Sequence, residues 1–129
     1  MTPEQRAALQ RAKARLDRLD LYPRPVRAGR VRIVVAPWFF RLPKLRRYDG
    51  YALARTILLR RADAGDDLVT HELCHVWQFQ HRPLHVLWTY ATTRYERNPY
   101  EAEARRAVDV TRVQHAEGKG GPGAIRPPS

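Results

Sequence analysis

Two histidines four positions apart, His71 and His75, place the strongest restriction on how this chain can fold. They flank Glu72 in the stretch His-Glu-Leu-Cys-His. Apolar residues accompany them at helical spacing: Val69, Leu73 and Val76. We therefore predict a helix over residues 67–80. Four residues make just over one helical turn, so both imidazoles project from one face of that helix.

The chemistry of this stretch favours a zinc site. A neutral imidazole is a good ligand for Zn²⁺, and two imidazoles one turn apart can reach one ion. Glu72, one position round the helix from His71, would face a water on that ion and take its proton. A pattern with three fixed positions also arises by chance. Its place on a predicted helix, directly after a predicted strand, favours the metal site.

A catalytic zinc takes three protein ligands and keeps one position open. His81 has the spacing of a longer histidine pattern, but that pattern turns the chain back at a glycine where this chain has Gln78. Glu101, on a predicted helix that starts at Asn98-Pro99, is the preferred third ligand. As the third residue of that helix, Glu101 could instead close a capping box. Glu103 is the alternative carboxylate.

The remaining pattern predicts one α+β domain over residues 1–116, with a small, mainly antiparallel sheet packed on three to four helices. The other expected elements are helix 4–20, strand 31–35, strand 51–60, helix 84–95 and helix 99–115. The site would lie in a groove between the second strand and the site helix. Trp77 and Trp88 are expected to anchor the core between helices. Residues 117–129, rich in glycine and proline, are expected to form a disordered tail.

Composition limits the function classes. The 129 residues include one cysteine, Cys74, which excludes an intrachain disulfide and a four-cysteine zinc site. No apolar run approaches the roughly 20 residues that span a bilayer. The N-terminus lacks the apolar segment of a secretory signal, which favours the cytoplasm without excluding leaderless export. The net charge of +11 would give weak nucleic-acid affinity, although a solvated basic surface also explains it.

Two segments of the chain resemble the gluzincin group of zinc metallopeptidases. They are residues 68–78, around the paired histidines, and residues 98–104, Asn-Pro-Tyr-Glu-Ala-Glu-Ala. The resemblance extends over about 51–108 and is strongest to small bacterial proteins with a minimal, zincin-like peptidase core. It implies a zinc ion bound by His71, His75 and Glu101, with Glu72 as general base and later as acid.

The resemblance has two further implications. The strand around 51–59 would bind a substrate peptide by β-augmentation. The group often has an aspartate after the alanine that corresponds to Ala104, where it orients a ligand histidine, but this chain has Arg105. Losing such a partner lowers metal affinity or activity roughly 10–100-fold. Glu103, Asp109 or a backbone carbonyl would have to replace it.

These features together predict a zinc-dependent metallopeptidase that hydrolyses peptide bonds in an unidentified peptide or protein. Two alternatives remain. The first is a non-catalytic zinc-binding module, closed by a fourth ligand such as His81 or Glu103. The second is a basic nucleic-acid-associated protein. Three tyrosines could donate a hydrogen bond to an oxyanion in the catalytic case: Tyr90, Tyr95 and Tyr100.

Overall fold

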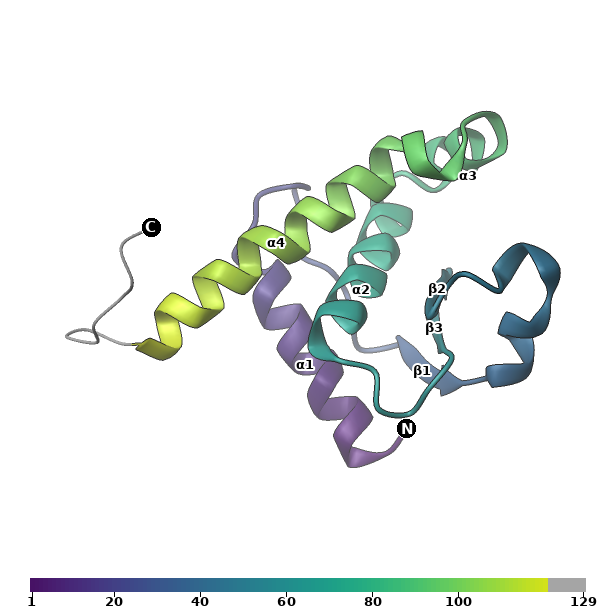
Figure 1. The fold of residues 1–129 in the computed structure, drawn as a ribbon. Coiled ribbons are helices and arrows are strands. Elements are labelled where there is room, and N and C mark those ends of the chain that lie inside the picture. The colour runs from purple at the N-terminus through teal and green to yellow at the C-terminus, as the bar shows by residue number, and fades with distance from the viewer. Residues whose placement is uncertain (121–129) are drawn as a thin grey trace.

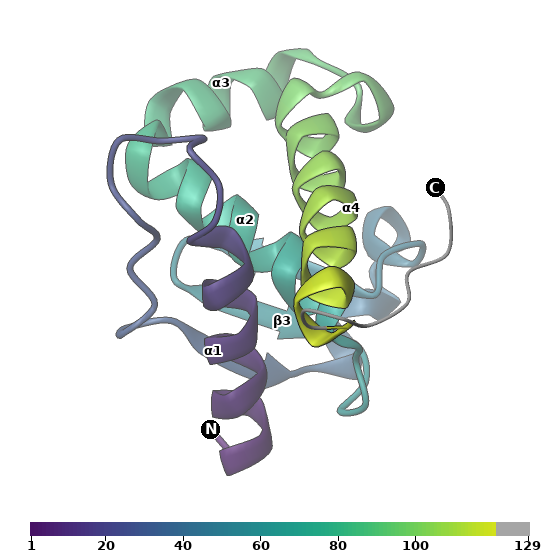
Figure 2. The ribbon, with the colours of Figure 1, turned by 90° about the vertical axis from the view of Figure 1, so that its left-hand side faces the viewer.

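The computed structural model describes residues 1–120, with side chains as far as Arg112. Within those residues it contains α1 (Pro3–Leu16), β1 (Arg32–Val35), β2 (Gly50–Leu53), β3 (Thr56–Leu59), α2 (Asp66–His81), α3 (Pro83–Thr92) and α4 (Pro99–Gly120). Short 3-10 turns span Pro37–Arg41, Pro43–Leu45 and Tyr95–Arg97. α2 is central: α1 and α4 pack on one side of it and the sheet on the other (Figures 1 and 2). The predicted α+β class is confirmed.

The sheet has the strand order β1-β3-β2, so β3 is central and β2 forms an edge. β2 and β3 run antiparallel and pair Tyr51 with Leu58. β1 and β3 run parallel and pair Ile33 with Ile57. The sheet is therefore mixed, and the predicted antiparallel arrangement holds for β2 and β3. β2 and β3 form a hairpin and therefore point in opposite directions. β1 pairs with β3 and points the same way as β3, so it is antiparallel to β2.

The prediction of one strand over residues 51–60 is wrong, because this segment forms the hairpin of β2 and β3. Ala54 and Arg55 lie between the two strands. Ala54 has a φ of 52°, in the left-handed region where glycine or asparagine is usual. Neither turn residue carries a turn signal, so the sequence indicates one continuous strand. Asp49-Gly50, which does carry such a signal, leads into β2.

The core fills the space between the sheet, α1 and α2. Its largest fully buried side chains include Trp77, Leu16, Ile57 and Leu73. The indole N–H of Trp77 donates to the carbonyl of Arg24 at 2.8 Å, so its polar atom is satisfied as well. Trp77 is thus confirmed as a core anchor.

Arg15 ties α1 to α2 and α4. Its buried guanidinium donates to Asp67 of α2, and to Thr111 and the carbonyl of Val108 on α4, each at 3.0 Å. A buried charge is tolerated when it is paired and hydrogen-bonded in this way. The contact fixes the N-terminal helix against the two helices that carry the candidate site.

Helix ends differ from the predicted ones. α1 ends at Leu16, four residues before its predicted end. α4 begins as predicted, with Asn98 Oδ1 accepting the N–H of Tyr100 at 2.8 Å. α4 then continues to Gly120, so the helix extends past residue 115 and into the segment predicted as a tail. The rest of that predicted tail, residues 121–129, lies outside the described residues.

α3 leaves most of its apolar side chains in solvent. Leu84, Leu87 and Trp88 are 80%, 56% and 68% exposed. The prediction that Trp88 anchors the core is wrong, because α3 packs through Val86 and Thr89 instead. Periodicity detects an apolar helix face but does not show what covers it. Of the described helices, none is both long and apolar enough to span a membrane.

Candidate metal centre

α2 and α4 bring three ligand-type side chains to one point. Oε1 of Glu101 lies 3.0 Å from Nε2 of His71, and Oε2 lies 2.8 Å from Nε2 of His75. The two imidazole nitrogens are 3.1 Å apart. Within the described part of the chain, these side chains form the one group of His, Cys, Asp and Glu residues close enough to share an ion. The structure thus brings together the three predicted ligands.

The donor atoms suit a small divalent ion. Ligands that bind tetrahedral zinc at about 2.0–2.1 Å lie about 3.3 Å from one another. The separations of 2.8, 3.0 and 3.1 Å found here are close to that value. Two imidazoles and one carboxylate also match the donor set of catalytic zinc sites with three protein ligands. The geometry is therefore compatible with Zn²⁺, and the binding of zinc stays a prediction.

Glu101 supplies the negative charge of the group. Burial alone would raise its pKa, but hydrogen bonds with His71, His75 and Tyr90 overcome this and hold the pKa of Glu101 well below its usual range. For His75, burial lowers the pKa, but the hydrogen bonds to Glu101 and Gln78 together with the charges of Glu72 and Glu101 outweigh it and raise the pKa. Glu101 is therefore a carboxylate at neutral pH, the form that binds a metal.

The alternatives to Glu101 as third ligand lie elsewhere. His81 stacks on Tyr22, with ring centroids 5.1 Å apart. Glu103 accepts hydrogen bonds from Tyr22 at 2.5 Å and from Gln78 at 3.1 Å. The capping-box alternative also fails, because the carboxylate of Glu101 contacts the histidines and Asn98 caps α4 without it. Glu101 is thus the carboxylate that faces the paired histidines.

Gln78 fixes the orientation of His75. Its Nε2 donates to the carbonyl of Tyr100 at 2.9 Å and to Glu103 at 3.1 Å, two groups that can only accept. Oε1 of Gln78 therefore faces Nδ1 of His75, 2.8 Å away, and that nitrogen carries the proton. In the neutral ring Nε2, the nitrogen on the side of Glu101, is then the one that has a lone pair for a metal ion.

At the position where the resemblance predicts an aspartate that orients a ligand histidine, the chain has Arg105, and the side chain that contacts Nδ1 of His75 is Gln78. Glu103 reaches His75 through Gln78 instead of directly. Asp109, the other predicted substitute, pairs with Arg112 at 3.6 Å. Sequence reasoning missed Gln78 as a positioning residue, and its signal was the polar side chain at the position where the longer histidine pattern has glycine.

Glu72 is buried beside the ligands and next to the edge strand. It is 5% exposed, and burial raises its pKa against the opposing charges of the histidines. A Cβ at Gly50 would lie 3.1 Å from Cγ of Glu72 and 3.2 Å from Oε2, closer than ordinary contacts, so a side chain at this position would push Glu72 away from β2. A buried carboxyl with a raised pKa in a pocket is typical of a general base. Nothing in the sequence pattern indicated the role of Gly50.

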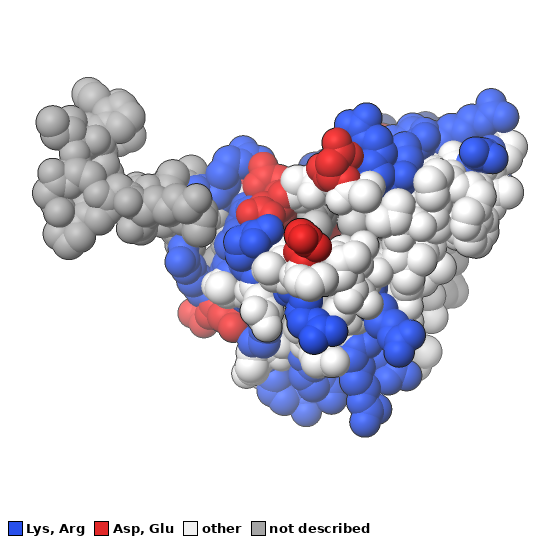
Figure 3. All heavy atoms as spheres, turned by 90° about the horizontal axis from the view of Figure 1, so that it is seen from below, with Lys and Arg blue, Asp and Glu red and all other residues white. Residues whose placement is uncertain are grey.

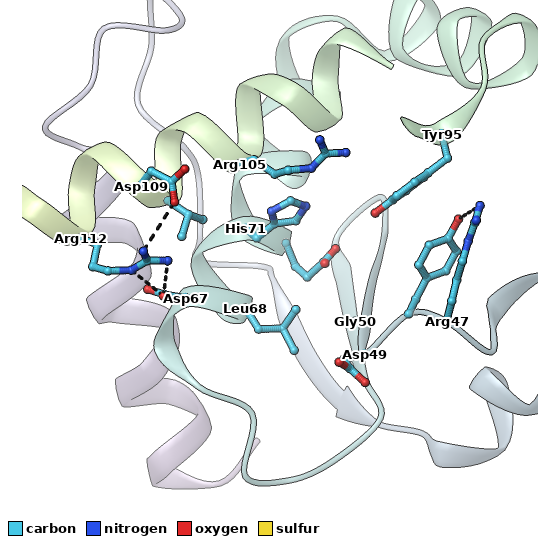
Figure 4. A pocket seen from close by; sticks show the side chains of 13 residues that line it. Arg47, Asp49, Gly50, Asp67, Leu68, His71, Tyr95, Arg105, Asp109 and Arg112 are labelled. Carbon is cyan, nitrogen blue, oxygen red and sulfur yellow. Dashed lines mark hydrogen bonds and ion pairs between the residues drawn. The ribbon is translucent and has the colours of Figure 1, made fainter. Parts of the chain in front are cut away.

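The site lies in a groove with two chambers. The larger, about 490 Å³, lies between β2 and α3. Its lining is mainly apolar and includes Leu53, Phe79, Val86 and Leu87. The smaller, about 410 Å³, lies beside α4 and is lined by many charged side chains, among them Arg47, Asp67, Arg105 and Asp109 (Figure 4). Both are lined by Tyr48, Gly50, Glu72 and Tyr95, so the chambers meet at the candidate metal centre.

Of the three predicted oxyanion donors, two lie at the site. The hydroxyl of Tyr90 donates to Oε2 of Glu101 at 2.7 Å, and Tyr95 lines both chambers. Burial and the charge of Glu101 raise the pKa of both tyrosines, so both hydroxyls keep their protons at neutral pH. Tyr100 is buried and its hydroxyl bonds to His85, away from the groove.

Comparison of the chain with protein families, with curated proteins and with solved structures found no match. The chemistry of the site therefore has to be inferred from its geometry.

Proposed function

We propose that this protein is a zinc-dependent peptidase in which His71, His75 and Glu101 hold the ion and Glu72 is the general base. One observation carries the proposal. Two imidazoles and a carboxylate converge in an open groove, and a second, buried carboxyl group lies beside them. A site that only bound metal would have no need of that fourth group.

Each component has a definite task. When bound, Zn²⁺ would lower the pKa of a coordinated water towards about 7 and polarise a substrate carbonyl. Glu72 takes a proton from the attacking water and passes it to the leaving amine. Its raised pKa brings it nearer to neutral pH, where a group can do both. Tyr95, where the chambers meet, is placed to donate to the developing oxyanion.

The open edge of β2 supports a peptide as the substrate. The N–H of Arg60 bonds to the carbonyl of Asp49 at 2.9 Å, which makes these residues a hydrogen-bonded pair at the end of the ladder. Because such pairs alternate along an antiparallel ladder, the backbone groups of Gly50 and Ala52 point away from β3. Both residues line the apolar chamber. An extended peptide can therefore add to β2 as another strand and cross the site.

A non-catalytic zinc module is the first alternative. A structural zinc ion is closed by four protein ligands. His81 and Glu103, the predicted fourth ligands, are engaged elsewhere. No fourth metal-ligating side chain of the described residues joins the group. A position left open towards the groove favours catalysis over a structural role.

A nucleic-acid-associated protein is the second alternative. Figure 3 shows basic side chains over much of one face, with uncharged surface between them. Several arginines are paired with acids, including Arg11 with Asp66 and Arg112 with Asp67. The net charge of +11 remains the support for this alternative. Binding to duplex DNA that falls steeply with salt would favour it. The cytoplasmic location, like the substrate, stays a prediction.

The function is tested with Glu72→Gln, which keeps the shape of the side chain and removes its basicity. Zinc content and cleavage of a mixed fluorogenic peptide library are measured on the same preparations. We expect the variant to keep its zinc and to lose at least about 100-fold in rate. Glu4→Gln, an exposed change in the first turn of α1, is the matched control. A zinc-loaded wild type that cleaves nothing, or a Glu72→Gln variant as active as wild type, would contradict the proposal.

A further inference from the structure

We infer that Arg105 binds a carboxylate of the substrate on the α4 side of the groove. The inference rests on the proposed peptidase function and adds a substrate class to it. Arg105 lies one turn after Glu101, so both project from the same face of α4. It lines the charged chamber together with His71 and Glu72. Figure 4 shows its guanidinium extending from α4 past His71 towards Tyr95, into the space of the chamber.

The other arginines of this chamber, and its aspartates, already have partners. Ion pairs join Arg112 to Asp67 at 2.6 Å and to Asp109 at 3.6 Å, Arg47 to Glu96 at 3.0 Å, and Arg60 to Asp49 at 3.4 Å. Among the side chains that the structure describes, none forms an ion pair with Arg105. The chamber thus contains a cation that is not neutralised from within, next to the reacting groups.

The chemistry of that cation selects the ligand. A guanidinium presents five N–H donors in a planar fork, which fits the two oxygens of a carboxylate. In the zinc-loaded site the two charges of the ion would balance the carboxylates of Glu72 and Glu101. Arg105 then leaves a positive charge on one side of the groove. The carboxylate can come from an acidic side chain or from the C-terminus of the peptide.

The two chambers of the groove suit different parts of a substrate. The chamber between β2 and α3 is lined mainly by apolar side chains such as Val86 and Leu87, and it suits an apolar residue. The chamber that contains Arg105 suits a carboxylate. The substrate class is therefore a peptide with an apolar side chain on one side of the cleaved bond and a carboxylate on the other.

The test measures peptide binding to the zinc-loaded full chain carrying Glu72→Gln, which prevents turnover. Three fluorescent peptide pools share an apolar residue and are compared by anisotropy. The first has glutamate and an amidated C-terminus, the second glutamine and an amidated C-terminus, and the third glutamine and a free C-terminal carboxylate. We expect one carboxylate pool to bind at least about tenfold more tightly than the neutral second pool. Which pool it is identifies the source of the carboxylate.

The same binding measurement on variants tests whether Arg105 causes the preference for a carboxylate. Arg105→Ala should abolish the difference between pools, and Arg105→Lys should keep part of it. Arg106→Ala, an exposed arginine of the same helix that does not line the chamber, should leave it unchanged. Zinc content and circular dichroism confirm that each variant is folded, and Arg105→Gln replaces Arg105→Ala if it is not.

The outcomes separate this inference from the proposed function. Equal binding of the three pools, or a carboxylate preference that survives Arg105→Ala, would overturn the role of Arg105. Cleavage of neutral peptides by the wild type would then still support the peptidase. Failure of every pool to bind, with no cleavage by the zinc-loaded wild type, would overturn both.

Discussion

Nδ1 of His75 lies 2.8 Å from Oε1 of Gln78, three residues further along α2. Gln78 is held in turn by Glu103 of α4, and Glu103 by the hydroxyl of Tyr22. Three segments that are distant in sequence therefore determine how one imidazole faces Glu101. The network fixes the ring orientation and the tautomer in which neutral His75 can bind a metal through Nε2.

Replacing Gln78 should weaken metal binding without unfolding the protein. Gln78→Met keeps the size of the side chain and removes its three hydrogen bonds, to His75, to Glu103 and to the carbonyl of Tyr100, so His75 loses its fixed tautomer. We expect zinc affinity to fall roughly 10–100-fold, measured by competition with a chelator. Gln80→Met, on the same helix and bonded to the backbone of Arg27, should have wild-type affinity. Equal affinities in both variants would contradict a positioning role for Gln78.

Gly50→Ala should impair turnover and leave zinc content unchanged. The new Cβ would lie 3.1 Å from both Cγ of Glu72 and Cδ1 of Leu68, closer than ordinary contacts. Glu72 would have to shift, and small displacements of a catalytic group are costly. We expect peptide cleavage to slow at least about tenfold. Gly29→Ala is the control, because no heavy atom lies within 4 Å of its added Cβ. Unimpaired cleavage by Gly50→Ala would place the general base elsewhere.

The two helix-borne tryptophans should respond oppositely to truncation. Trp77 is 1% exposed and its N–H is hydrogen-bonded, so Trp77→Ala should cost about 3–5 kcal/mol in free energy of unfolding. Trp88 is 68% exposed, and Trp88→Ala should change that free energy by less than about 0.5 kcal/mol. Urea unfolding measures both. A large loss in Trp88→Ala would mean that α3 packs more tightly than described.

Asp67 should make the fold sensitive to acid. Burial favours its protonated form, but hydrogen bonds from Arg112 and Arg15 outweigh this and lower its pKa below the usual 3.8. A lowered pKa stabilises the folded state above the unfolded pKa, and this stabilisation is lost as pH falls through the folded pKa. At pH 7, Asp67→Asn should therefore be less stable than wild type by about 1 kcal/mol.

The difference between Asp67→Asn and wild type should shrink as the pH falls below 3.8, because wild-type Asp67 then becomes protonated too. Thermal unfolding at pH 7 and at about pH 3 measures the change. Asp63→Asn serves as control, because the side chains of Asp63 and of its partner Arg61 are 79% and 77% exposed, and such a pair contributes little to stability. A stability difference that stayed constant with pH would argue against the ion pairs as its cause.

Local patterns predicted the parts of the site that local geometry determines. The spacing of His71 and His75 within a helix fixes their common face. Asn98-Pro99 fixes where α4 begins, and so which face carries Glu101. These positions depend on a few neighbouring residues, and the structure places all three side chains together as expected.

Other features depend on contacts between distant segments, which no local pattern encodes. Tyr22 meets Glu103 across 81 positions, and the helical bundle has to form before that contact exists. The hairpin turns at Ala54, whose positive φ is set by the pairing of β2 with β3 and not by a turn residue. Trp88 has the periodicity of a core residue, yet no described element covers it.

The measurement that tests the central claim most directly is zinc per chain by elemental analysis, on the native protein and on Glu101→Ala. Both are purified without added metal. The His71–His75–Glu101 site predicts about one zinc per native chain and a small fraction of that in the variant. Unchanged zinc in Glu101→Ala would remove Glu101 from the site. A native protein that binds no zinc even after reconstitution would contradict the account as a whole.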